Sequence, residues 1–101
     1  MINNQTFGQA IEAVKQGKLI AREGWNGKGM FVFQRPEDTL PTHVIENVKS
    51  LPQTVKDYYR GTTEPVKFTA YLCMKAADGS IVNGWLASQT DVLSTDWCIL
   101  D

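Results

Sequence analysis

The residues best suited to chemistry in this 101-residue sequence lie in two short segments. In the first segment, Trp25 precedes Asn26, Gly27 and Lys28. A tryptophan at a turn offers a flat face for stacking a base, and a nearby lysine offers positive charge to a phosphate. Asn26 could read a base edge or a ribose hydroxyl. Residue types alone favour the alternative, in which Trp25 folds back over a sheet and Asn26-Gly27 only makes a turn.

The second segment runs from Trp85 to Asp91 and includes Ser88, Gln89 and Thr90. Ser88 followed by Asp91 is typical of a helix N-cap with an acid in the first turn. The free N–H groups there, with the hydroxyls of Ser88 and Thr90, could instead hold a phosphate or a ribose. The negative charge of Asp91 favours ribose hydroxyls over a bare phosphate, and Trp85 could either stack on a ligand or fill the core.

Catalysis is poorly supported by the remaining polar residues. His43 is the only histidine and lies among prolines, where an exposed loop position is the more ordinary outcome. Cys73 and Cys98 lack the spacing of a zinc site. The glycines between 24 and 29 lack the spacing and the following helix of a phosphate-binding loop. We therefore expect a binding protein with no catalytic residues, no metal and no cofactor.

An amphipathic helix is expected over residues 6–16, ahead of the first segment. Thr6 and Gln9 have the spacing of a capping box, and Gly17 stands where a glycine commonly ends a helix. One apolar stripe follows from the i, i+3, i+4, i+7 spacing of Phe7, Ala10, Ile11 and Val14.

The expected strands cover residues 18–23, 30–34, 66–75, 80–85 and 96–100. Asn26-Gly27 and Asp78-Gly79 predict hairpin turns, and a short helix is expected at 88–93. Residues 36–65, punctuated by prolines, form a helical or irregular insertion with candidate helices at 42–50 and 54–60. The predicted fold is α+β, an antiparallel sheet of about five strands with the N-terminal helix packed on it and Trp97 in the core.

Length and composition fit a single folded domain over residues 1–101, with 43% hydrophobic and 10% aromatic residues. The net charge of −1 gives no pull toward nucleic acid or membrane. Residues 1–35 carry five basic and two acidic groups, whereas the rest carry five basic and nine acidic. No signal peptide or spanning segment is apparent, so we expect a cytoplasmic protein with free thiols, although a Cys73–Cys98 bridge stays open.

Two stretches together resemble a known family. AREGWNGKGMFV covers residues 21–32, and GWLASQTDVLSTDWCIL covers residues 84–100. With the first helix and the strand at 66–75, they are similar to the phage Thoeris anti-defense proteins of the second type. Residues 36–65 match no pattern that we can identify in that family, so roles there stay open.

The resemblance implies a sponge that sequesters glycocyclic ADP-ribose without cleaving it. Bacterial TIR-domain enzymes make this signal, and its removal keeps the Thoeris effector inactive. The resemblance also implies a homotetramer with ligand pockets where subunits meet, acting in the host bacterial cytoplasm. A cyclic dinucleotide ligand, a signal-degrading enzyme and a protein–protein module without a small ligand remain alternatives.

On such a ligand, Trp25 would stack the base, and Arg22 and Lys28 would face the pyrophosphate. Ribose or base edges would meet polar side chains of both segments. The complete set of expected ligand contacts is Arg22, Trp25, Asn26, Lys28, Trp85, Ser88, Gln89, Thr90 and Asp91.

Overall fold

The computed structural model describes residues 1–100, and their contacts divide the chain into two compact units. The first unit combines residues 1–35 with the segment from Tyr71 onward, and the second is Pro36–Ala70. Among the described residues, no helix has both the length and the apolar character needed to cross a membrane.

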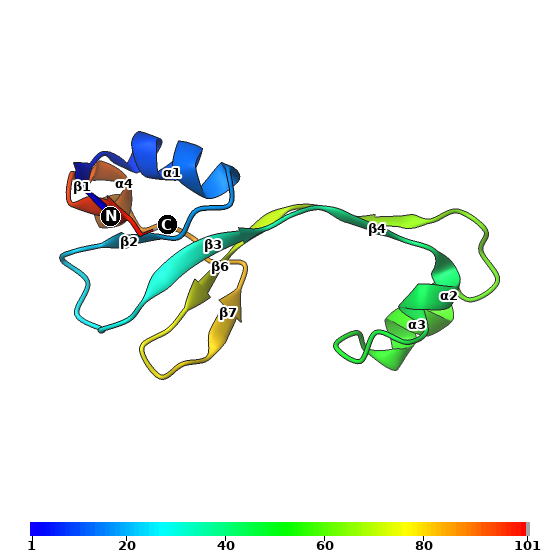
Figure 1. The fold of residues 1–101 in the computed structure, drawn as a ribbon. Coiled ribbons are helices and arrows are strands. Elements are labelled where there is room, and N and C mark those ends of the chain that lie inside the picture. Colours follow the sequence, from blue (N-terminus) through cyan, green and yellow to red (C-terminus); the bar gives the residue numbers. More distant parts are fainter. Residues whose placement is uncertain (101) are drawn as a thin grey trace. The chain divides into compact units, whose positions relative to one another are not determined.

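The first unit is built on a six-stranded antiparallel sheet with the order β1-β8-β2-β3-β6-β7. Segments from both ends of the chain therefore meet in adjacent strands, as Figure 1 shows. The strands are β1 (Ile2–Gln5), β2 (Ile20–Arg22), β3 (Phe31–Arg35), β6 (Tyr71–Lys75), β7 (Ile81–Asn83) and β8 (Trp97–Ile99).

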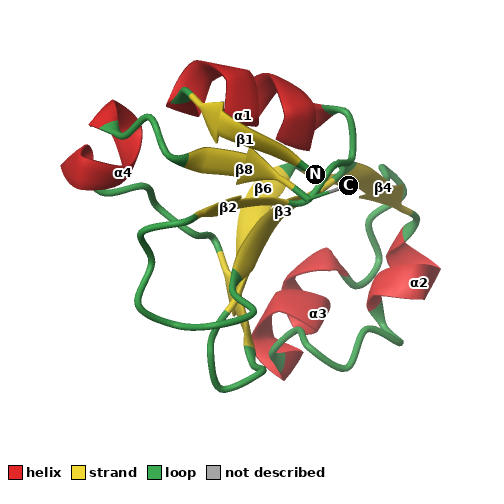
Figure 2. Ribbon diagram, turned by 60° about the vertical axis from the view of Figure 1, so that its left-hand side comes forward, coloured by secondary structure: helices red, strands yellow, loops and turns green. Residues whose placement is uncertain are grey.

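Helix α1 (Phe7–Lys15) lies along one face of this sheet, in contact with β2, β3 and β8 (Figure 2). The predicted capping box is confirmed: the Gln9 N–H donates to Thr6 Oγ1 at 3.1 Å, and the Thr6 N–H donates to Gln9 Oε1 at 2.8 Å. Gly17, just beyond the helix, has φ of 90°, which suits glycine. The helix prediction was therefore correct to within a residue at each end.

A single apolar core lies between α1 and the sheet. Trp97 is fully buried there, as predicted, and its ring centroid is 5.5 Å from that of Phe7. The buried members of this core are Ala10, Ala13, Val14, Ile20, Val32, Met74 and Trp97. Trp97 is the largest fully buried side chain among the described residues, so it contributes more apolar burial than any other residue of this core.

The expected strand at 66–75 is two strands that belong to different units. β6 continues the ladder with β3 as far as the Arg35–Tyr71 pair, whereas β5 (Val66–Phe68) pairs with β4 (Asp38–Leu40). Pro36 follows the last residue of β3 and has no N–H to donate to a ladder. The sequence also did not reveal β1, so the sheet has six strands where about five were expected.

The second unit contains the two-stranded β4–β5 sheet and two short helices. Helix α2 (Thr42–Ile45) and helix α3 (Gln53–Tyr59) follow Pro41 and Pro52 and fall within or close to the two predicted spans. Ile45 is almost fully buried. The expected helical or irregular insertion therefore has regular structure of its own, including strand β4, which the sequence did not indicate.

The loop between β2 and β3, residues 23–30, confirms the turn expected between the strands at 18–23 and 30–34, and it is one residue longer at each end. Asn26-Gly27 lies in the middle of this loop, and no strand residue directly flanks it. A Cβ on Gly27 would lie 2.8 Å from the Ala77 Cβ, so glycine is needed here for close packing. The Asp78-Gly79 turn is confirmed, because Gly79 has φ of 91° and its N–H donates to the Ala76 carbonyl at 3.0 Å.

Candidate functional site

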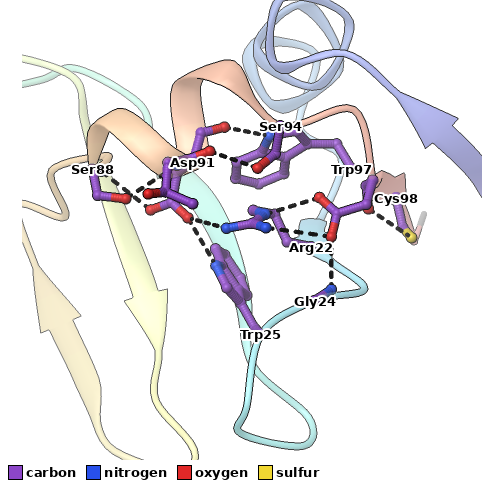
Figure 3. Close-up of polar contacts among 10 residues, drawn as sticks. Arg22, Gly24, Trp25, Ser88, Asp91, Ser94, Trp97 and Cys98 are labelled. Carbon is purple, nitrogen blue, oxygen red and sulfur yellow. Dashed lines mark hydrogen bonds and ion pairs between the residues drawn. The ribbon is translucent and has the colours of Figure 1, made fainter.

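The polar centre of the first unit is a guanidinium held between two carboxylates (Figure 3). Arg22 ends β2, and its Nη1 donates to Asp91 Oδ1 at 2.9 Å while its Nε donates to Asp96 Oδ1 at 2.9 Å. We call Arg22, Asp91 and Asp96 the Arg22 cluster. All three side chains are mostly buried, so their interactions are poorly screened by solvent.

Asp91 is the residue on which most of these contacts converge. It lies in helix α4 (Gln89–Leu93), and its Oδ1 also accepts from Trp25 Nε1 at 3.1 Å. Its Oδ2 accepts from the Ser88 N–H at 3.1 Å, and its own N–H donates to Ser88 Oγ at 3.1 Å. The predicted Ser88 N-cap is thus confirmed as a reciprocal capping box. The Asp91 carbonyl accepts from Trp97 Nε1 at 2.8 Å, which fixes α4 to the core.

Asp96 holds the beginning of the 23–30 loop. Its Oδ2 accepts from the Gly24 N–H at 2.8 Å, and its carbonyl accepts from the Glu23 N–H at 3.1 Å. A Cβ on Gly24 would lie 2.7 Å from that same Oδ2 and 3.2 Å from Arg22 Nη2. Position 24 therefore has no room for a side chain while the Arg22 cluster stays in place.

Three tryptophans meet beside the Arg22 cluster, each edge-on to the others. The Trp25 ring centroid is 5.4 Å from that of Trp97 and 6.1 Å from that of Trp85, and Trp85 is 6.3 Å from Trp97. Trp97 is buried, whereas Trp25 and Trp85 are half-buried and pack against the core. Trp25 does fold back and pack against the core, and the residue stays partly exposed.

The hydrogen bonds around the two carboxylates keep them ionised. Burial would raise the pKa of Asp91, but hydrogen bonds from Arg22, Trp25 and Ser88 outweigh it, so the pKa lies below the usual value. The Arg22 hydrogen bond lowers the pKa of Asp96, again against a smaller effect of burial. The pKa of Arg22 is raised by its hydrogen bonds to Asp96 and Asp91. The cluster thus contains one positive and two negative charges at neutral pH.

The expected ligand contacts fall into two groups in the structure. Arg22, Trp25, Ser88 and Asp91 form one connected network, with Trp85 packed against Trp25. The other four are solvent exposed, on the 23–30 loop or in the first turn of α4: Asn26, Lys28, Gln89 and Thr90. The expectation that Arg22 faces a pyrophosphate stays a prediction, and in this conformation two carboxylates already balance its charge.

Sequence reasoning did not identify Asp96 and Gly24 as parts of this network. The two carboxylates Asp91 and Asp96 are visible as a pair in the sequence, but nothing local indicates that they converge on Arg22. That convergence follows from the β2–β8 register, in which Arg22 pairs with Trp97 and so lies beside Asp96. The convergence could have been predicted only if the pairing of β2 with β8 had been known.

Metal binding and thiol chemistry find no support in the part of the chain that the structure describes. Within residues 1–100, no group of three or more His, Cys, Asp or Glu side chains is arranged to hold a metal ion. Cys73 and Cys98 are both free and buried, and burial raises the pKa of the Cys98 thiol. A buried thiol with a raised pKa is a poor nucleophile.

Comparison with known proteins agrees with the resemblance seen in the sequence. Residues 5–100 match the model of the Thoeris anti-defense 2-like domain. A protein of Bacillus phage SP01 described as Thoeris anti-defense 2 is 38% identical over 104 residues, covering 99% of each chain. The match therefore extends across both units, including residues 36–65. The chain belongs to the Thoeris anti-defense 2-like family.

Proposed function

We propose that this protein counteracts Thoeris defence by binding glycocyclic ADP-ribose and holding it uncleaved. Family membership supports the anti-Thoeris role, since a relative of the same length carries that name. The observation that supports nucleotide binding is the pair of half-buried indoles, Trp25 and Trp85, which are fixed edge-on against Trp97. Indole faces held in this way suit an adenine base.

The exposed polar residues around these indoles match the rest of such a ligand. Lys28 on the 23–30 loop carries a positive charge for the pyrophosphate, and Asn26 offers an amide to a base edge. Gln89 and Thr90 at the start of α4, with the Ser88 hydroxyl, offer donors and acceptors to ribose. No step in this proposal breaks a bond, so no general base is required.

We further propose that the pocket is completed by other copies of the chain, in a homotetramer. Sequestration requires a dissociation constant near nanomolar, roughly −12 kcal/mol. Stacking contributes only about 1–3 kcal/mol per base, so an enclosed and preorganised pocket is needed. Leu86, before α4, and Leu93, at its end, are 89% and 77% exposed, and a neighbouring subunit would cover such apolar side chains. The site of action would be the cytoplasm of the infected host.

The test is calorimetric titration with glycocyclic ADP-ribose, with a cyclic dinucleotide as comparator, followed by heating of the complex and chromatography of the released ligand. Nanomolar binding and recovery of the intact molecule are expected. Recovery of a cleaved product would instead indicate an enzyme, and tighter binding of the dinucleotide would change the ligand. Absence of binding to both compounds would refute the proposal.

A matched pair of variants separates ligand contact from assembly. Trp25→Ala should abolish binding while light scattering shows an unchanged tetramer. Tyr58→Ala removes another aromatic ring, 77% exposed and in the second unit, and should leave binding unchanged. If Trp25→Ala instead dissociates the oligomer, the indole belongs to a subunit interface.

A further inference from the structure

We propose that Arg22, Asp91 and Asp96 are positioning residues, which fix the Trp25 indole and the start of the 23–30 loop before ligand arrives and do not contact the ligand. This inference rests on the proposed function and identifies what makes the site preorganised. It assigns the Arg22 cluster a different role from the pyrophosphate and ribose contacts expected from the sequence.

The Arg22 cluster holds both the side chain and the backbone of Trp25 in place. Asp91 accepts from the indole Nε1 at 3.1 Å, while Asp96 accepts from the N–H of neighbouring Gly24 at 2.8 Å. The Arg22 carbonyl also accepts from the Trp25 N–H at 3.3 Å. The side chain and the backbone of Trp25 are therefore both connected to the same three residues.

The polar groups of the cluster already have hydrogen-bond partners within the protein. The Asp91 Oδ1 already accepts two hydrogen bonds and its Oδ2 accepts a third from Ser88, while Arg22 donates to both carboxylates. The net charge of the cluster is negative, so an approaching phosphate would meet repulsion. Every buried polar side-chain atom of the cluster therefore has a partner, and the net charge has the wrong sign for a phosphate. Such a cluster is suited to support a binding surface and not to form it.

A buried ion-pair cluster of this kind is not explained by stabilisation of the fold alone. Burying an ion pair costs desolvation, and apolar residues of similar volume often stabilise a fold as well. The Arg22 guanidinium, however, has a fixed fork geometry that connects β2 with α4 and with the residue before β8. Such a connection sets the angle and position of the indole, which packing alone would leave less defined.

A positioning role predicts how the apparent dissociation constant and the binding rates change when the cluster is disrupted. If only a fraction of molecules hold Trp25 in place, the apparent dissociation constant rises by the inverse of that fraction. The loss then appears in the association rate, and the dissociation rate stays unchanged because every contact with the ligand remains. Loss of a direct ligand contact would instead raise the dissociation rate.

The first experiment needs no ligand. Protein labelled with 5-fluorotryptophan should give a single sharp ¹⁹F resonance for Trp25, assigned by its disappearance in Trp25→Phe. Arg22→Gln and Asp91→Ala should shift and broaden that resonance, whereas Arg60→Gln should not, although Arg60 also bridges two carboxylates. Arg22→Gln leaves the Ser88–Asp91 capping box intact, so a change there does not come from loss of α4. An unchanged Trp25 resonance in both cluster variants overturns the proposal.

The second experiment measures association and dissociation rates with glycocyclic ADP-ribose by stopped-flow tryptophan fluorescence. For Arg22→Gln we expect an association rate about 10-fold lower and an unchanged dissociation rate. A raised dissociation rate with normal association would make Arg22 a ligand contact and overturn the proposal. If wild-type protein does not bind this ligand, the proposed function fails, while the ¹⁹F spectra still decide whether the cluster positions Trp25.

Discussion

Within residues 1–100, two arginines each bridge two carboxylates, and they lie in very different surroundings. Arg22 contacts Asp91 and Asp96 at 2.9 Å each, with only 14% of its side chain exposed. Arg60 contacts Glu46 at 3.3 Å and Asp57 at 3.0 Å, with 61% exposed. Hydrogen bonds to Asp96 and Asp91 raise the pKa of Arg22. The pKa of Arg60 is raised by its hydrogen bond to Glu46 and by the charges of Glu46 and Asp57. Similar ion pairs therefore occur in both units, but the arginine side chain is mostly buried in the first unit and mostly exposed to solvent in the second.

The ion pairs of the two arginines are alike, so their different roles depend on how deeply each side chain is buried and on which residues it links. The Arg60 pairs link residues close in sequence, within the second unit. The Arg22 pairs link residues 69 and 74 positions apart and also support an indole and a loop backbone. Exposed pairs contribute little because solvent and salt screen them, whereas breaking a buried pair leaves an uncompensated charge.

The largest expected effect comes from removing the buried arginine. Arg22→Gln should lower the free energy of unfolding by about 3 kcal/mol, because Asp91 and Asp96 are left close together without a counter-charge. Arg60→Gln should produce no measurable change in urea-denaturation midpoint. Equal losses in the two variants would show that burial does not distinguish the two arginines.

Gly24→Ala should have the next largest effect, about 2 kcal/mol of destabilisation, because the new methyl group would lie 2.7 Å from Asp96 Oδ2. Gly8→Ala is the matched control, since its Cβ would meet nothing closer than 3.9 Å and it lies in α1. That control should be neutral or slightly stabilising in thermal unfolding. A neutral Gly24→Ala would mean that the Arg22 cluster can move aside at little cost.

Trp25→Phe tests the contact between indole and cluster at a smaller scale. It keeps an aromatic ring but removes the Nε1–H that donates to Asp91, and should cost about 1 kcal/mol. In a double-mutant cycle with Arg22→Gln, the two losses should not add, because both residues share the Asp91 Oδ1 acceptor. Strict additivity would contradict a shared network.

Changing the pH near neutrality should have the smallest effect on the free energy of unfolding. The folded-state pKa values of Asp91 and Asp96 are lowered, so these carboxylates contribute stability above the unfolded-state pKa of about 3.9. The unfolding free energy should therefore hardly change between pH 5 and 8 on their account. It should fall as the pH drops below about 4 and through the folded pKa values. Arg22→Gln should weaken this dependence, and an identical pH profile in that variant would contradict it.

Local sequence patterns predicted the parts of the site that depend on nearby residues. Thr6 with Gln9, and Ser88 with Asp91, form capping boxes because the three-residue spacing alone brings their groups together. Trp97 was predicted in the core, which is the ordinary position for a large aromatic side chain in a strand, and it is fully buried.

Other parts depend on contacts that no local pattern encodes. Asp96 reaches Arg22 only through the β2–β8 register. β1 is polar and irregular, with Asn4 at φ of 58° and a register shift, so alternation does not reveal it. At Gly27, the turn is present as predicted, but the close packing against Ala77 is a long-range contact that the Asn-Gly pattern does not indicate.

The span of the Arg22–Asp96 contact determines when the site can form during synthesis. The two residues are 74 positions apart, and Ile2 pairs with Ile99 at the sheet edge. Domains generally fold as units while the chain emerges from the ribosome, and contacts this distant in sequence form slowly. A nascent chain that ends before α4 contains Trp25 but neither carboxylate that holds it. The Arg22 cluster therefore forms only after α4 and Asp96 have left the ribosomal exit tunnel.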